Sequence, residues 1–112
     1  MSLSDYRISK RIADDGYDYE EIIAAAGAAA PDAASGAAIE RAFRHRVSDY
    51  AMARSAALRS PDYTFASLIM GALRRADTSN TLALKNAFPK IYDEFYARYW
   101  APGGVIDESE RE

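Results

Sequence analysis

The chain has 112 residues, of which 49% are apolar and 28% are charged, and its formal net charge is −3. This length and composition are typical of one globular domain. With no cysteine and one histidine, the sequence excludes a disulfide scaffold, a cysteine nucleophile, a thiolate-bound metal and a two-histidine metal site. No apolar run approaches the roughly 18 residues of a membrane span, and the N-terminus lacks a signal-peptide pattern. We therefore expect a cytoplasmic protein that holds no metal or cofactor.

Helical spacing of apolar residues begins near the N-terminus. It predicts a first helix over residues 5–15, with Ser4 as its N-cap. A second helix is expected over residues 18–30. Asp18 and Glu21 have the spacing of a capping box, in which each side chain accepts from the other's backbone amide.

The middle of the chain predicts a linker followed by the longest helix. Residues 31–36 combine proline, aspartate, serine and glycine, which favours a loop. An apolar stripe with steps of three and four then predicts one continuous helix over residues 36–59. The Ser60–Pro61 pair is typical of a helix start, so the next helix is expected to begin there and to end before residue 77.

Two more helices are expected over residues 79–87 and from Pro89 to about residue 101. Residues 105–112 form an acidic tail, which we expect to fray. No segment alternates in the manner of a strand. The sequence therefore predicts an all-α fold, a compact bundle of about five or six helices, with residues 1–104 as a single domain.

Alanine makes up about a fifth of the chain, whereas aromatic residues gather at positions 88–100. Alanine favours helix and close packing but buries little surface. We therefore expect the rings of the last helix to supply much of the core, with that helix at the centre of the fold.

The aromatic residues of the last helix also form the first candidate binding surface. Tyr92, Tyr96, Tyr99 and Trp100 share one side at steps of four, three and one. These rings cover a wider arc than one buried stripe needs. Tyrosine and tryptophan are favoured at protein interfaces, so part of this arc is expected to contact a protein partner, which can be a second copy of the chain.

A second candidate surface is acidic. Asp14 and Asp15 lie close to Tyr17 and Tyr19 in a stretch that also contains Asp18, Glu20 and Glu21. Carboxylates interleaved with tyrosines can bind a basic partner. Helix capping and solubility explain the same residues without a partner, and the sequence leaves both interpretations open.

The alternative function is nucleic-acid binding through Arg41, Arg44, Arg46 and Arg54. These residues can contact phosphates, or they can form a solvated face paired with nearby carboxylates. A helix-turn-helix over residues 7–25 is disfavoured, because its second helix begins with acidic residues that DNA would repel.

No catalytic site is predicted. His45 has arginine neighbours and no orienting partner on a second element. Asp93 and Glu94 are adjacent, so they point about 100° apart on a helix and form no dyad. The sequence also lacks a glycine-rich phosphate loop. These observations favour a protein that is not an enzyme.

The stretch from Leu68 to Gly104 contains Leu-Ile-Met-Gly-Ala-Leu-Arg-Arg-Ala-Asp, then Ala-Phe-Pro and finally Ala-Pro-Gly-Gly. It resembles the C-terminal part of small uncharacterised helical proteins of bacterial prophages and mobile elements. The resemblance covers about a third of the chain and implies a helical accessory protein without assigning a role to any residue. Together these patterns predict a small accessory protein that acts by protein–protein interaction.

Overall fold

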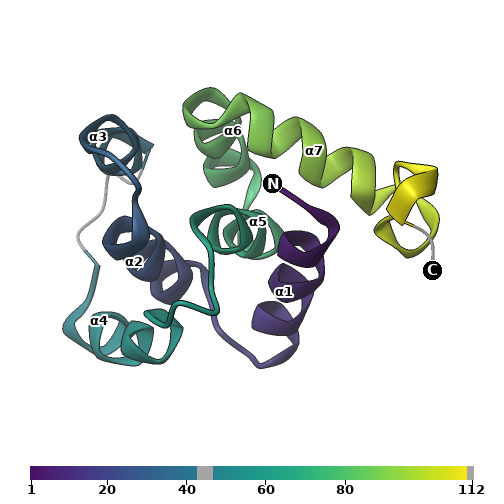
Figure 1. Cartoon of the computed structure of the whole chain (residues 1–112). Helices are drawn as coiled ribbons and strands as arrows, with labels where there is room; N and C mark the ends of the chain where they lie inside the picture. Colours follow the sequence, from purple (N-terminus) through teal and green to yellow (C-terminus); the bar gives the residue numbers. More distant parts are fainter. Residues whose placement is uncertain (43–46, 111–112) are drawn as a thin grey trace.

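Four helices of this protein pack around one central helix, α5 (Figure 1). The computed structural model describes residues 1–42 and 47–110, and in these residues it has seven α-helices and no strand. The all-α prediction is confirmed, whereas the predicted number of helices was slightly low. The α-helices are α1 (Leu3–Asp14), α2 (Tyr19–Ala29), α3 (Ala33–Ala42), α4 (Asp49–Ser55), α5 (Phe65–Arg75), α6 (Thr78–Ala87) and α7 (Pro89–Tyr99). Three short 3-10 helices, η1 (Ala56–Leu58), η2 (Pro102–Gly104) and η3 (Glu108–Glu110), complete the described elements.

The capping box predicted at the start of α2 is present. The Asp18 carboxylate accepts from the Glu21 amide, and the Glu21 carboxylate accepts from the Asp18 amide. At the start of α1 the N-cap is Ser2, whose hydroxyl accepts from Asp5, and not Ser4. The two helices therefore begin where side chains satisfy free amides of the first turn.

The single long helix predicted over residues 36–59 is wrong. In the structure α3 ends at Ala42, and α4 begins only at Asp49. Ser48 has an extended backbone and its hydroxyl accepts from the Ala51 amide at 3.1 Å. This N-cap starts a separate helix, so the apolar stripe belongs to two elements that run in different directions (Figure 1).

The helix start predicted at Ser60–Pro61 is also wrong. Residues 60–63 form a turn, and α5 begins at Phe65. Thr64 is its N-cap, with a hydroxyl that accepts from the Ser67 amide. The same hydroxyl donates to buried Asp5 at 2.6 Å, which ties the start of α5 to α1.

The centre of the core is α5 and not the C-terminal helix that the sequence predicted. Leu68, Ile69 and Met70 have no exposed surface. This helix packs against α1, α2, α6 and α7, and all residues from Ser67 to Leu73 are buried, so every face of its middle turns is covered. In α7, by contrast, Phe95 is the one apolar side chain that is fully buried. Aliphatic residues therefore fill most of the core, and the rings of α7 lie at its edge.

Gly71 allows α5 to approach α1 and α2 closely. A Cβ at this position would lie 3.5 Å from Ile12 Cγ2 and 3.6 Å from Ile22 Cγ2, which are ordinary van der Waals distances. We expect Gly71→Ala to raise the free energy of unfolding by about 0.5–1 kcal/mol, because alanine fits and favours helix. Gly71→Leu should instead lower it by about 1–3 kcal/mol through overpacking. Urea denaturation measures both, and a less stable Gly71→Ala variant would contradict this packing.

Candidate functional site

The aromatic residues of α7 form a continuous row that leaves the core toward solvent. Pro89 starts the helix at a position where no amide is needed. The rings of Tyr92 and Tyr96 lie 4.6 Å apart and are half-buried against the core. Tyr99 and Trp100 form an edge-to-face pair at 5.1 Å and are 51% and 79% exposed. The predicted surface thus divides into an inner packed half and an outer exposed half.

A groove of about 510 Å³ lies beside the exposed half. We call it the aromatic groove. Its walls come from the last turns of α1 and α5 and from the side of α7. The lining residues are Ala13, Asp14, Leu73, Arg74, Arg75, Phe95, Tyr96 and Tyr99. Five of these eight residues lie outside α7, and among the five the sequence had singled out only Asp14.

Arg74 is the charged residue most enclosed by the groove wall. Its guanidinium carbon lies 4.7 Å from the centre of the Tyr6 ring and 5.3 Å from that of Phe95. Nε donates to the Ser9 hydroxyl at 3.0 Å. Nη2 is buried and has no hydrogen-bond partner within residues 1–42 and 47–110. The cation is therefore compensated by ring faces and a hydroxyl, and no described carboxylate pairs with it.

Below the exposed rings, the C-terminal tail is fastened to α7. Arg98 is 3% exposed. It donates to the Gly104 carbonyl at 2.9 Å, to Glu94 at 3.1 Å and to Glu110 at 2.7 Å. Glu110 also accepts from the amides of Ile106 and Asp107. The sequence predicted that residues 105–112 fray. In the structure residues 105–110 fold back, and Glu110 meets the buried guanidinium of Arg98.

Gly104 makes this fold-back possible. Its φ is +73°, and a Cβ would lie 2.7 Å from two carbons of the Tyr6 ring. Glycine is the residue that adopts such a backbone without strain. The chain can therefore turn directly over α1 and bring Glu110 to Arg98.

The Arg98–Glu110 pair makes stability depend on pH in acid. Hydrogen bonds from Arg98 lower the pKa of Glu110 from 4.5 to about 2. Because the folded pKa lies below the unfolded one, the stabilisation is complete above pH 4.5 and is lost as the pH falls toward 2. We expect the difference in unfolding free energy between the native protein and Glu110→Gln to shrink over this range. Urea denaturation at several pH values measures it, and a constant difference would contradict the pairing.

The acidic candidate surface is divided by the structure. Asp14 and Asp15 are exposed, and Asp14 pairs with Lys10 at 3.2 Å. Tyr19, however, is 9% exposed, and burial followed by the charge of Asp77 raises its pKa to about 12. Tyr17 is half-buried. Tyr19 therefore belongs to the core, and the acidic residues do not share one face with both tyrosines.

The arginine cluster is likewise not one surface in the described residues. Arg54 lies on α4 and forms an ion pair with Glu21, which is 3% exposed. Its guanidinium also lies over the rings of Tyr17 and Tyr50, and its pKa is raised chiefly by the hydrogen bond to Glu21. Arg54 thus fastens α4 to α2. Arg44 and Arg46, like His45, lie outside the described residues.

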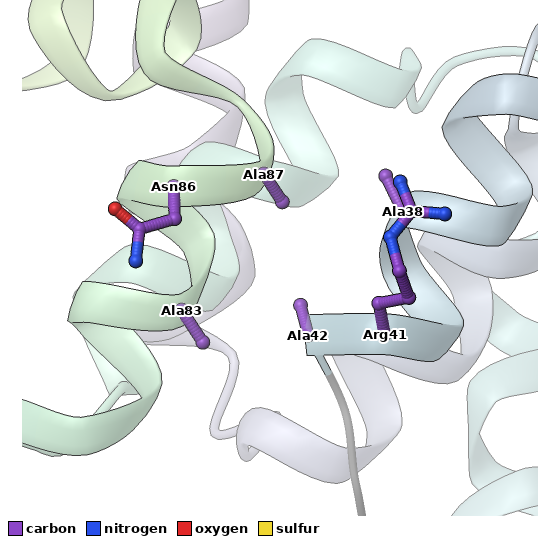
Figure 2. Close-up of a pocket in the computed structure, with 6 residues that line it drawn as sticks. All are labelled: Ala38, Arg41, Ala42, Ala83, Asn86 and Ala87. Carbon is purple, nitrogen blue, oxygen red and sulfur yellow. The ribbon is translucent and has the colours of Figure 1, made fainter.

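Arg41 lies on a different helix, α3, at a cleft of about 280 Å³ between α3 and α6. Figure 2 shows alanine methyl groups of the two helices on either side of this cleft, with Asn86 turned away from α3. The other lining residues are Ala38, Ala42, Ala83 and Ala87. Arg41 is the one charged residue that lines this cleft. The described residues therefore do not bring the predicted arginines together, and nucleic-acid binding by the four arginines remains a prediction.

The sequence interpretation missed a second exposed apolar region. A groove of about 570 Å³ lies between α2, α3 and α4, and Ile23, Ile39, Val47 and Met52 contribute to it. Tyr50, 72% exposed, is on the same α4. The sequence had placed Ile39, Val47 and Tyr50 in the apolar stripe of the long helix. In the structure Ile39 is buried, whereas Tyr50 is exposed on the separate α4.

The part of the chain that the structure describes contains no group of three or more His, Asp or Glu residues that could hold a metal ion. None of its helices has the length and hydropathy needed to cross a membrane. Comparison of the chain with protein-family models, with curated proteins and with solved structures gave no match.

Proposed function

We propose that this protein is a non-enzymatic accessory factor that binds a segment of a partner protein in the aromatic groove. The observation that carries the proposal is an exposed ring pair: Tyr99 lines that groove, and Trp100 packs against Tyr99. Large rings bury much area on binding and lose little conformational entropy, and they dominate the energy of many interfaces. A solvent-facing tryptophan beside a hollow of this volume is typical of such a contact.

The position of the rings also supports a protein partner. Phe95 and Tyr96 line the groove, and their rings pack edge to face with ring centres 5.1 Å apart. Tyr99 lies 6.1 Å from both of them. The exposed rings are therefore anchored on a packed helix, and a preformed surface binds with less loss of entropy than a flexible one.

The single tryptophan of the chain gives a direct test, because Trp100 lies in the proposed surface. Its emission in the free protein should be that of a water-exposed indole. Short peptides selected from a displayed random library should shift this emission to the blue. Tyr99→Ser should weaken their binding roughly tenfold or more.

Tyr50→Ser is the matched control, since Tyr50 is also an exposed tyrosine and lies on α4, away from the lining of the groove. It should leave peptide affinity unchanged. Selected peptides that leave Trp100 emission unaffected would overturn the proposal. Light scattering of the free protein identifies the remaining case: a dimer that shields Trp100 would assign this surface to a second copy of the chain.

A further inference from the structure

We infer that the segment recognised by the aromatic groove is acidic, with a carboxylate that binds at Arg74 and Arg75. This inference rests on the proposed function and specifies the chemistry of the partner. The groove wall carries two guanidinium groups, and neither has a described carboxylate partner.

Arg74 carries the first step of the argument. Removing a guanidinium from water costs free energy that an opposite charge normally offsets. Here the ring faces of Tyr6 and Phe95 and the Ser9 hydroxyl offset part of it, while the buried Nη2 donates to no described group. The groove therefore lies next to a cation whose charge no described carboxylate neutralises.

Arg75 adds a second cation on the same side. It is exposed, and its Nη2 donates to the Ala13 carbonyl near the end of α1. This contact leaves the other guanidinium nitrogens open to water. A carboxylate at this end of the groove would lie near both cations that line it, and the exposed Arg75 can favour it through charge-assisted hydrogen bonds.

Asp14 is the carboxylate on the groove lining. Whether its removal strengthens or weakens peptide binding shows which charge the ligand carries. The charge of Asp14 is offset by Lys10 at 3.2 Å. One of the two interpretations that the sequence left open was that Asp14 attracts a basic partner. Next to Arg74 and Arg75 it would instead repel an acidic one, so removing its charge distinguishes the two partners.

The rings define the rest of the ligand. Phe95, Tyr96 and Tyr99 provide an aromatic wall, which suits an apolar side chain next to the carboxylate. A volume of about 510 Å³ falls within the roughly 300–1,000 Å³ of sites that enclose drug-sized ligands. The groove therefore suits a short segment with one or two acidic residues beside an aromatic or branched residue.

The test uses peptides selected from a displayed random library on the full chain. Aspartate or glutamate should be enriched next to an apolar residue. Changing the aspartate or glutamate of the peptide to asparagine or glutamine should weaken binding roughly tenfold. Arg75→Gln in the protein should do the same. Applied together, the two changes should cost little more than either alone, because they remove one interaction. Arg7→Gln, at an exposed position of α1 outside the groove, should have no effect.

Asp14→Asn provides the second measurement and should tighten binding of the acidic peptides severalfold. Weaker binding would show a basic ligand and overturn the inference. Peptides that shift Trp100 emission but lack acidic residues and ignore Arg75→Gln would also overturn it, while leaving the proposed function intact. Acidic peptides that bind Tyr99→Ser with full affinity and leave Trp100 emission unchanged would overturn both.

Discussion

Phe95→Ala should lower the free energy of unfolding by about 3–5 kcal/mol. The ring is 2% exposed, and its centre lies 5.8 Å from the centre of the Tyr6 ring and 5.1 Å from that of Tyr96. The guanidinium of Arg74 also lies over it. Truncation would open a cavity at the junction of α1, α5 and α7. Since domains of this size are stable by about 5–15 kcal/mol, urea denaturation should show a large fraction of the stability lost.

Tyr99→Ala is the control for this prediction. It lies one turn further along α7 but is half exposed, so we expect a change within about 0.5 kcal/mol. Equal losses for the two variants would show that the rings of α7 are not divided into a packed and an exposed half. Phe95→Leu retains most of the volume and should cost less than the alanine variant.

Local signals in the sequence predicted the parts of the fold that local interactions determine. The capping box of Asp18 and Glu21 depends on residues three apart and is present as predicted. The break before α4 depends on the Ser48 cap. A serine within an apolar helical stripe is compatible with a helix interior as well as with a cap. Periodicity alone therefore could not separate one long helix from two.

The candidate site was predictable only in part for the same reason. Helical spacing correctly places Tyr92, Tyr96 and Tyr99 on one helix, because all lie within α7. Which rings face outward depends on the elements that pack against α7. The role of Arg74 was hidden, since its Ser9 contact lies 65 residues away in sequence. The groove is a tertiary feature, and no pattern within one helix indicates it.

Arg98 connects α7 to residues that follow it in the chain, up to Glu110. Replacing Arg98 is the second prediction with a large effect. Arg98→Met should lower the free energy of unfolding by about 3 kcal/mol, because it leaves Glu94 and Glu110 without their shared buried cation. The tail should detach, since Glu110 loses the guanidinium that holds it. Hydrogen exchange should show the amides of Ile106 and Asp107 losing protection.

Glu94→Gln is the matched control for Arg98→Met. It removes one ion pair within α7 but leaves Arg98 bonded to Glu110 and to the Gly104 carbonyl. The tail amides should therefore keep their protection, with a smaller loss of stability. If Arg98→Met leaves those amides protected, the tail is held by other contacts and the Arg98–Glu110 pair does not fasten it. If both variants release the tail, Glu94 is needed to orient Arg98. Glu94 lies one turn earlier on α7 and accepts from Arg98 Nε, which would fix the planar guanidinium in the position that Glu110 requires.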